Sequence, residues 1–512
     1  MAGLAAAALA DRGESVTVTA PTRAGVEPLF ERARVLLRDL GRAVPEEADV
    51  IDLAGGGQIR YLQPARAVEA VQPSSIVIAD EAAGIAVPIL EQLLAADRLV
   101  CSTTVHGYEG TGRGFAIRFR DRLEASDHTV TDVTLTEPIR YSGGDPLEIW
   151  AFHALLLDAA PAVTPVVESG SVETVTYEVL TPTELIANEP RLREVMGLLT
   201  EAHYRTEPND LARLLDAPNL TVRALLHGGH VVSVALLARE GGLSADLRGA
   251  IYEGDRVQGH MIPDMLTSYG RDEDAGRPTG IRIVRIATHE AVRSRGLGTH
   301  LLEQIATEFE GAVDWLGAGF GATPDLVHFW DQAGYGTISV SMNRNDRSGV
   351  HSAIMLRPMS SAGRQLRDRH ARWLRRRLPA ACTDSLATIH PPTLQAIIPT
   401  IPGEPAVSLE PNEWAIVIAA AFGPGLLAVD PEPARRLLLA YLSLSDDERR
   451  LDQADERLLI RRVLFGEACA DLASTLGYPS TRECWRAVGR SLQPIVERFV
   501  PDELTAEIAR FE

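Results

Sequence analysis

The chain has 512 residues, which is too long for one hydrophobic core, so two to four domains are expected. Hydrophobic residues make up 45% of it and its formal net charge is −20, which excludes a low-complexity or strongly basic protein. All 50 basic residues are arginine. An acidic chain without lysine suggests adaptation to high salt, and a GC-rich genome that favours arginine codons is the alternative. Net acidity usually argues against a nucleic-acid partner, but salt adaptation would mask one.

The cysteines and apolar runs narrow the class further. Cys101, Cys382, Cys469 and Cys484 form no C-x-x-C pair, so neither a structural zinc site nor any other metal site is predicted. The alanine-rich start lacks the basic region of a signal peptide. No uncharged apolar run reaches the roughly 18 residues of a membrane span. We therefore expect a cytoplasmic protein with reduced thiols and no membrane partner.

The first 160 residues alternate strands and helices, which predicts a parallel α/β sheet. The expected helices cover residues 1–10 and 26–40, and the expected strands cover 15–20, 59–63, 75–80 and 99–103. The third strand ends in Asp80 and Glu81. An acidic pair after an apolar strand is typical of a Walker B site, where Asp holds Mg²⁺ through water and Glu orients the attacking water. Two acids after a strand also occur by chance.

The sequence lacks the loop with which such an ATPase holds phosphates. A P-loop reads G-x-x-x-x-G-K-[ST], and a chain without lysine contains no such motif. This argues against ATP with Mg²⁺ as a ligand of this polypeptide alone.

A second α/β region follows a proline-containing linker near residues 159–172. Strands are expected at 172–180, 222–226, 231–238, 281–286, 314–320, 337–342 and 353–357, and helices at 192–204, 299–309 and 324–332. Arg293, Gly296 and Gly298 form R-x-x-G-x-G between a strand and a helix. Glycines at such a turn let backbone amides point outward and seat an anion such as a pyrophosphate. The dinucleotide fingerprint G-x-G-x-x-G does not fit, and a plain tight turn is the alternative.

This motif resembles the acetyl-CoA loop of the GNAT acetyltransferase superfamily. Four longer stretches extend the likeness: RIATHEAVRSRGLGTHLL, WLGAGFGATPDLVHFWDQAGYGTISV, SGVHSAIML and EAHYRTEPNDLARLLDAPNL. They resemble the tRNA(Met) cytidine acetyltransferase family, whose members fuse a helicase-like ATPase module to a GNAT module. ADEAAGIAVPIL, STTVHGYEGTGRGF and EPIRYSGGDPLEIW match the ATPase motifs of that family.

The resemblance implies an α/β fold class in three parts. Residues 1–160 would be an incomplete RecA-like P-loop ATPase domain, residues 172–358 a GNAT acetyltransferase domain, and residues 359–512 a helical tRNA-binding region. In the family, the P-loop directly precedes the helix that residues 1–10 resemble, and a further N-terminal domain lies ahead of it. The chain therefore looks truncated, by a misassigned start, a split gene or a genuine loss.

The resemblance also implies the binding sites. The acetyl-CoA residues would be Ile286, Ala287 and Thr288 along the pantetheine arm, Arg293, Ser294, Arg295, Gly296, Leu297, Gly298 and Thr299 around the pyrophosphate, and Asp325 and Gln332 on the next helix. Arg293 stands where many GNAT members have Gln, and Glu and Arg are frequent at the last two positions. The implied ATP-site residues are Asp80, Glu81 and Arg140.

The implied acetyl acceptor is the exocyclic amine of cytosine, which is conjugated into the ring and is a poor nucleophile. Positioning of this amine and removal of its proton should carry much of the rate. His289 directly follows the cofactor strand and has the pKa class of a general base near neutral pH, and a capping or loop histidine is the alternative. His351 is a second candidate. Arg205 and His260 are candidates for RNA contacts, with surface salt bridges as the alternative.

The C-terminal region begins with a basic helix expected at residues 361–379. Its arginines are Arg364, Arg367, Arg369, Arg372, Arg375, Arg376 and Arg377. They are suited to neutralise RNA phosphates, with Trp373 available for stacking; a solvated, salt-bridged helix is the alternative. Residues 413–511 indicate several helices, among them 414–421, 434–442 and 458–465.

The resemblance favours an RNA cytidine acetyltransferase. The expected substrate is the wobble cytidine of elongator tRNA(Met), and in intact members ATP hydrolysis would remodel the RNA. Two alternatives stay open: a GNAT enzyme that acts on a protein or small amine, and an inactive RNA-binding remnant. The oligomeric state is not predicted.

Overall fold

The computed structural model describes residues 1–44, 49–103, 119–135, 142–201, 208–345, 349–403, 407–424 and 427–511. The chain divides into two compact units. The first consists of Met1–Ala238, Ile283–Ile305 and Asn345–Gly349, and the second of Arg239–Arg282, Ala306–Arg344 and Val350–Glu512. Within the described ranges, no helix combines the length and the apolar composition needed to cross a membrane.

The N-terminal sheet has five strands in the order β2-β3-β1-β4-β5. They are β1 (Ser15–Thr19), β2 (Val50–Asp52), β3 (Gln58–Tyr61), β4 (Ile76–Asp80) and β5 (Arg98–Ser102). β1 runs parallel to β3 and β4, and β4 runs parallel to β5, so the predicted parallel sheet is confirmed. The edge strand β2 is antiparallel to β3 and was not predicted, because three residues show no usable alternation.

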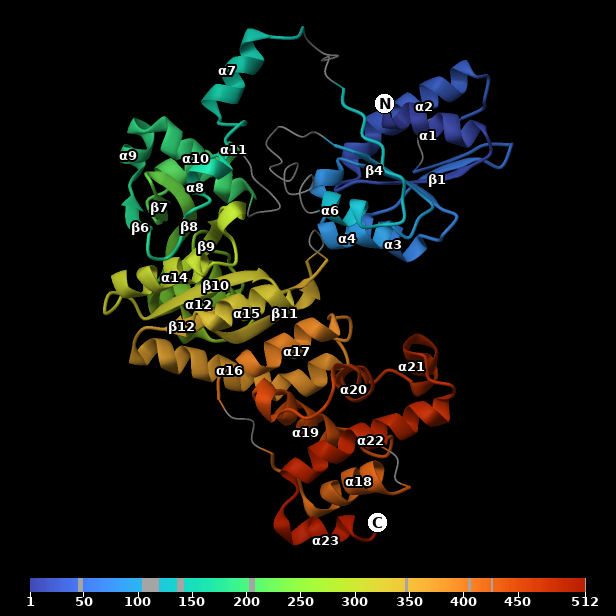
Figure 1. The fold of residues 1–512 in the computed structure, drawn as a ribbon, viewed down its shortest axis with the longest axis vertical. Helices are drawn as coiled ribbons and strands as arrows, with labels where there is room; N and C mark the ends of the chain where they lie inside the picture. The colour runs from blue at the N-terminus through green and yellow to red at the C-terminus, as the bar shows by residue number, and fades with distance from the viewer. Residues whose placement is uncertain are drawn as a thin grey trace. The chain divides into compact units, whose positions relative to one another are not determined.

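Helices cover both faces of this sheet (Figure 1). Helices α1 (Ala2–Asp11) and α2 (Glu27–Asp39) pack with Ile78 in one buried cluster. Helices α3 (Pro64–Ala70) and α4 (Val87–Leu93) pack with Val77 and Ala79 in another. Successive residues of β4 therefore face opposite layers, which explains why its sequence is continuously apolar.

The second sheet has seven strands in the order β11-β12-β10-β9-β8-β7-β6. They are β6 (Thr176–Leu180), β7 (Leu220–His227), β8 (His230–Gly241), β9 (Thr279–Thr288), β10 (Trp315–Gly321), β11 (Gly336–Arg344) and β12 (His351–Pro358). β7 is antiparallel to β6 and β8, and β12 is antiparallel to β10 and β11. Every strand predicted in this region is present. β6 starts four residues later than expected, since Ser171 and Thr174 close a turn through Ser171 N to Thr174 Oγ1 at 2.9 Å.

Helices follow the strands of the second sheet. They include α9 (Pro182–Ala187), α10 (Glu189–Glu201), α11 (Pro208–Asp216), α12 (Ala245–Glu253), α13 (Met261–Ser268), α14 (Leu297–Glu308) and α15 (Pro324–Gln332). Earlier in the chain lie α6 (Arg120–Glu124), α7 (Pro146–Ala154) and α8 (Thr164–Val167). The prediction for α15 is confirmed, whereas α14 starts two residues before the predicted 299 and therefore includes Gly298.

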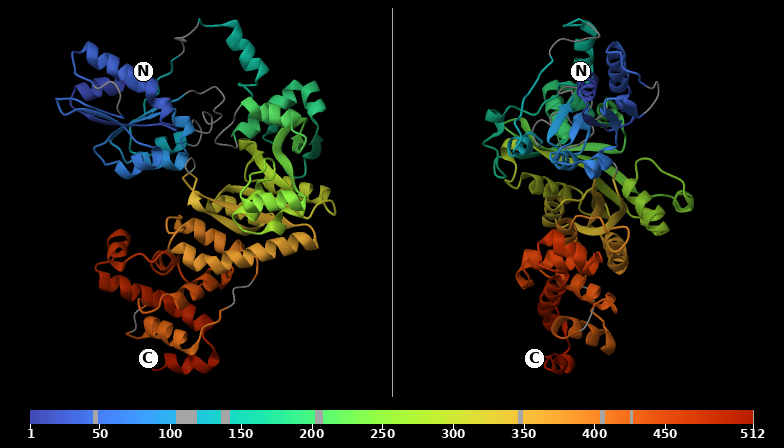
Figure 2. Two further views of the ribbon diagram at one scale, coloured as in Figure 1. Left: turned by 180° about the vertical axis from the view of Figure 1, so that it is seen from behind. Right: turned by 90° about the vertical axis from the view of Figure 1, so that its right-hand side faces the viewer.

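The C-terminal residues form helices that share a core with the end of the sheet. Figure 2 shows the long helix α16 (Ser361–Cys382), which packs against β11 and β12. One buried cluster joins Val340 and Ala353 to Leu374 and Trp414. The further helices are α17 (Pro391–Thr400), α18 (Pro411–Phe422), α19 (Glu432–Leu442), α20 (Gln453–Leu459), α21 (Cys469–Leu476), α22 (Thr481–Phe499) and α23 (Thr505–Ile508). The segment predicted as one helix at 458–465 is the end of α20 followed by a π-helical turn, Ile460–Leu464.

Candidate functional site

The end of strand β9 is pinned to strand β8 by side-chain and backbone hydrogen bonds. Ser233 Oγ donates to the Ala287 carbonyl at 3.0 Å and lies 2.9 Å from Thr288 Oγ1. The His289 amide donates to the Val232 carbonyl at 2.9 Å. These hydrogen bonds fix the position of residues 287–289 against β8. Ser233 was not predicted, because a lone serine in an apolar strand carries no recognisable signal.

The loop after β9 is anchored at both ends and exposed between them. Val292 and Leu297 are buried, whereas the four residues 293–296 are exposed. Ser294 has φ 59° and Gly296 has φ 79°, so two residues with left-handed backbone reverse the chain into α14. A side chain at Gly296 would have space, since the nearest atom to an added Cβ is 3.8 Å away, so its glycine serves the backbone conformation.

This geometry makes a seat for an anion at the start of α14. The His300 amide donates to the Gly296 carbonyl at 2.8 Å, which closes the first turn. The amides of Leu297, Gly298 and Thr299 therefore have no intrahelical partner, as at any helix N-terminus. Helix α14 is 12 residues long, and its dipole adds positive potential at these amides. Three adjacent backbone amides are thus available to an anion at the predicted pyrophosphate position.

The two arginines of the loop are bound to different extents. Arg293 Nε donates to the Thr288 carbonyl at 3.0 Å. Arg295 donates to the carbonyls of Glu168 at 2.6 Å, Ala291 at 3.0 Å and Gly170 at 3.4 Å. Arg295 therefore fastens the loop to residues 168–170, and Arg293 keeps more of its guanidinium for a ligand.

His289 is buried, and both of its ring nitrogens are in hydrogen-bond contact. Nε2 lies 2.7 Å from the Ala162 carbonyl, which can only accept a hydrogen bond, so Nε2 carries the proton. Nδ1 accepts from the Ala291 amide at 3.2 Å, and the ring thereby caps the short helix Glu290–Val292. The capping role that was the alternative prediction is present. Nδ1 carries the lone pair with which this histidine could accept a proton.

The other predicted cofactor residues lie in the second compact unit. Asp325 stands in the first turn of α15 and Gln332 is its last residue, seven positions later. Seven residues are two helical turns, so both side chains share one face, and both are exposed. They make no hydrogen bond or ion pair in the part of the chain that the structure describes.

The two further histidines that the sequence suggested each contact a backbone group through Nδ1. His351 is buried, Nδ1 lies 2.8 Å from the Ser341 carbonyl, and Nε2 has no partner among the described residues. Loss of hydration on burial lowers the pKa of His351, so the ring is neutral at neutral pH. His260 Nδ1 accepts from the Gly241 amide at 3.1 Å, and its contact with RNA stays a prediction.

The acidic pair of the N-terminal sheet sits at the end of β4. Asp80 is half-buried and Glu81 has φ 49°, a left-handed conformation that is rare outside glycine. The Ala83 amide donates to Thr103 Oγ1 at 3.3 Å, which ties the turn to the segment after β5. The structure does not describe Arg140, Arg205 or residues 104–115 of the glycine-rich stretch.

The arginines of α16 divide into a first group with partners in the structure and a second group without partners among the described residues. Arg375 donates to the carbonyls of Ile401 and Gly403, and Arg369 pairs with Asp272 at 2.6 Å, so these two hold the fold together. Arg367 pairs with the adjacent Asp368 at 2.8 Å. The remaining four are exposed and make no hydrogen bond or ion pair within the described ranges: Arg364, Arg372, Arg376 and Arg377. Only this second group is available to a partner.

Comparison with known protein families gives matches to the N-terminal and the central part of the chain. Residues 1–158 match the family RNA cytidine acetyltransferase NAT10/TcmA, helicase domain, and residues 194–313 and 301–360 match GNAT acetyltransferase 2. The tRNA(Met) cytidine acetyltransferase TmcA of Haloferax volcanii is 48% identical over all of this chain and 68% of its own length. That of Haloarcula marismortui is 48% identical over 97% of this chain and 64% of its own length. The chain thus spans about two thirds of these relatives. The ribosomal-protein-S18-alanine N-acetyltransferase of Escherichia coli is 16% identical over 36% of this chain and 94% of its own, with a TM-score of 0.25.

Proposed function

Because the chain belongs to the tRNA(Met) cytidine acetyltransferase family, we propose that it transfers acetyl from acetyl-CoA to the exocyclic amine of a cytidine in tRNA. The observation that carries the proposal is the turn from β9 into α14. It presents three helix-terminal amides and Arg293 at one exposed loop, which suits a pyrophosphate. The target is the wobble cytidine of elongator tRNA(Met).

The residues that hold the cofactor follow from this turn. The backbone from Ile286 to Thr288 lies along the pantetheine arm, and residues 293–299 hold the pyrophosphate. On the family resemblance, Asp325 and Gln332 of α15 are proposed as further acetyl-CoA residues. Bound acetyl-CoA supplies the thioester, and the protein supplies the orientation of its two substrates.

His289 is the proposed general base. Its Nε2–H is held by the Ala162 carbonyl, so proton transfer would use Nδ1, which must leave the Ala291 amide. That hydrogen bond is 3.2 Å long, at the upper end of the ordinary range, and it is the contact of Nδ1 that the exchange would break. Deprotonation raises the nucleophilicity of an amine whose lone pair is delocalised into the cytosine ring.

The RNA surface includes the exposed arginines of α16, since Arg364, Arg372 and Arg376 lie at multiples of four residues along one face. In this protein of net charge −20, a local group of unpaired cations favours an anionic partner. The proposed modules are residues 1–160 for the helicase-like part, 172–358 for acetyl transfer and 359–512 for tRNA binding. An enzyme of mature tRNA is expected in the cytoplasm.

Asp80 and Glu81, with Arg140, are proposed as residues of an ATP site. They would hold Mg²⁺ and water, but this sequence contains no P-loop to hold the phosphates. Acetylation by this polypeptide should therefore not depend on ATP.

The test is acetylation of tRNA by the purified chain with acetyl-CoA in high salt, with and without ATP, read by mass spectrometry of nucleosides. We expect acetylcytidine at the anticodon wobble position in both conditions. Labelled acetyl in peptides or small amines, with none in RNA, would show the alternative GNAT activity. tRNA binding without any acetyl-CoA binding would show an RNA-binding remnant.

A further inference from the structure

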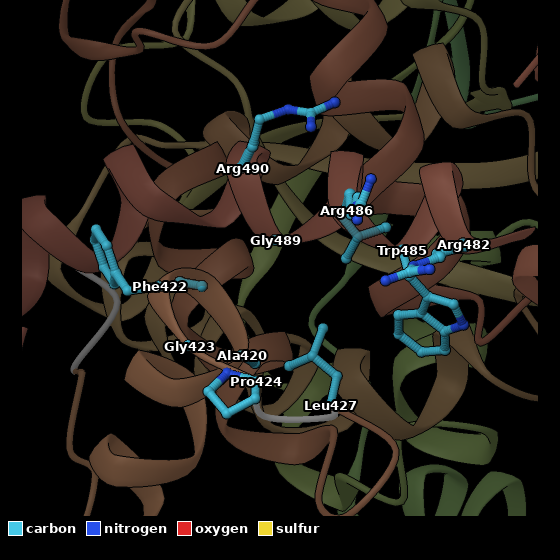
Figure 3. Close-up of a pocket in the computed structure, with 12 residues that line it drawn as sticks. Ala420, Phe422, Gly423, Pro424, Leu427, Arg482, Trp485, Arg486, Gly489 and Arg490 are labelled. Atoms are coloured by element: carbon cyan, nitrogen blue, oxygen red, sulfur yellow. The ribbon is translucent and has the colours of Figure 1, made fainter. Parts of the chain in front are cut away.

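A pocket of about 500 Å³ opens between the end of helix α18 and the first half of helix α22 (Figure 3). Both helices belong to the second compact unit. The described residues that line the α18 side are mostly small or apolar, and those of α22 include three arginines and a tryptophan. The side chains that matter here are Leu427, Arg482, Trp485, Arg486 and Arg490.

The pocket is positive in an acidic protein. Arg482, Arg486 and Arg490 are spaced by four residues, so they lie on one face of α22 and spread over roughly 12 Å of helix. All three are exposed. No Asp or Glu is among the described residues that line the pocket, although the chain carries 70 acidic residues.

Two of the three guanidinium groups have no partner among the described residues. Arg486 pairs with Glu483 at 2.6 Å across one turn of α22. Arg482 and Arg490 make no hydrogen bond or ion pair with any residue that the structure describes. An unpaired, exposed cation on each side of Arg486 is a surface that binds anions without first breaking a salt bridge.

The pocket walls are fixed by packing. A Cβ added at Gly489 would lie 3.0 Å from the Ala420 carbonyl, so this glycine allows α18 to approach α22 closely. Gln493 Nε2 donates to the Ala421 carbonyl at 2.9 Å, which ties the end of α18 to α22. Arg462 lies over the Trp485 ring, 4.5 Å from its centroid, and holds the indole in place. The site is therefore preformed rather than assembled on binding.

We propose that this pocket binds the sugar-phosphate backbone of tRNA, with successive phosphates on Arg482 and Arg490 and a nucleoside against Trp485 and Leu427. The proposal rests on the proposed function and adds a second RNA surface to that of α16. Cations spread over about 12 Å match a chain of phosphates better than one small anion, which would need them to converge. An apolar wall beside the cations suits the nucleoside that links two phosphates.

The experiment measures tRNA affinity of the full chain by fluorescence anisotropy across a series of salt concentrations. The variant is R482Q/R490Q, and its matched control is R450Q/R457Q, which removes two exposed arginines that do not line the pocket. All four positions are exposed, so equal thermal melts will establish that both variants fold. We expect about ten-fold weaker binding at low salt and a salt slope smaller by about two for R482Q/R490Q, with the control unchanged.

Equal affinity and equal slope for R482Q/R490Q and the control would overturn the proposal. Inorganic phosphate is tested as a competitor at fixed ionic strength. We expect phosphate to displace tRNA from the wild-type chain no more than chloride does. Saturable displacement by phosphate that R482Q/R490Q abolishes, together with an unchanged salt slope, would instead show a site for a single small anion. The acetylation assay separates this inference from the proposed function: a wild-type chain that binds tRNA through the pocket and yields no acetylcytidine would contradict the function alone.

Discussion

Two turns of the first compact unit follow the carboxyl end of a β-strand and use left-handed backbone, yet they present opposite charge. The turn after β4 carries Asp80 and Glu81, with φ 49° at Glu81. The turn after β9 carries Arg293 and free amides, with φ 59° at Ser294 and φ 79° at Gly296. The backbone conformation of the two turns is similar, and the charge of their side chains decides whether each turn can bind a cation or an anion.

The difference bears on which of the two proposed sites has all the groups that it needs. Amides and a guanidinium bind phosphate oxygens directly. Carboxylates reach a phosphate only through a cation and leave the remaining oxygens to other donors, which the P-loop supplies in an ATPase. Under the proposed function, the turn after β9 would therefore bind its phosphates with its own groups, whereas the turn after β4 would need phosphate-binding groups that this sequence does not contain.

The largest expected effect on turnover comes from replacing His289. This residue is the proposed general base at the turn after β9, and the turn after β4 has no counterpart. In H289N the amide oxygen can still accept from the Ala291 amide, so the loop should keep its shape. We expect turnover to fall by about 100-fold or more, the usual contribution of a general base, with acetyl-CoA affinity within about three-fold. Calorimetry and single-turnover assays measure the two quantities. Full turnover in H289N would make His289 a capping residue only.

Gly296 tests the backbone side of the comparison. G296V forces a β-branched residue to φ 79°, so the loop must change shape and the amides lose their aim. We expect acetyl-CoA to bind at least about ten-fold more weakly, which corresponds to the 1–3 kcal/mol typical of such strain. The control is G311V, at φ 73° in the open turn after α14, which should lose similar stability and keep cofactor binding. Equal losses in both variants would refute the amide seat.

The sequence predicted the strands and the turn from β9 into α14 well, because their signals are local. Alternating apolar residues and the glycines of R-x-x-G-x-G act within a few positions. It did not predict that both nitrogens of His289 are held, since Ala162 is 127 positions away. It also could not separate the bound arginines of α16 from the free ones, because Arg369 meets Asp272 through tertiary packing. The left-handed Ser294 and Glu81 were missed because neither residue type favours that conformation.

Arg293 and Arg295 sharpen the comparison by separating ligand charge from loop support. Among the described residues, Arg293 makes one hydrogen bond to a backbone carbonyl and Arg295 makes three, so we expect R293Q to act on the ligand and R295Q on the fold. R293Q should weaken acetyl-CoA binding by about three- to ten-fold at low salt and by less at high salt. R295Q should instead lower the melting temperature. Titrations at two salt concentrations and thermal melts distinguish them, and the opposite assignment would contradict the geometry.

His351 is the rival base, and its burial predicts a stability effect rather than a catalytic one. Desolvation lowers the pKa of His351 below its ordinary value of 6.5. The unfolded chain therefore binds more protons than the folded one below about pH 6.5, so stability is full above that pH and is lost as pH falls toward the folded pKa. H351Q should flatten this loss in part, because burial also lowers the pKa of His390. Denaturant melts from pH 7.5 to about 5 test this. A collapse of turnover at neutral pH in H351Q would instead give His351 the role of base.

The smallest expected effect is at the acidic turn, where the comparison predicts none. D80N/E81Q removes both carboxylates but leaves the turn after β9 untouched, so acetylation without ATP should stay within about two-fold of wild type, the scatter expected for sites with no shared partners. ATP with Mg²⁺ should not change the thermal melt of wild type, whereas acetyl-CoA at 100 times its Kd should stabilise it by about 2.7 kcal/mol. Stabilisation by ATP that D80N/E81Q abolishes would contradict the comparison. It would mean that groups other than a P-loop lysine hold the phosphates, and that the two turns differ in ligand but not in completeness.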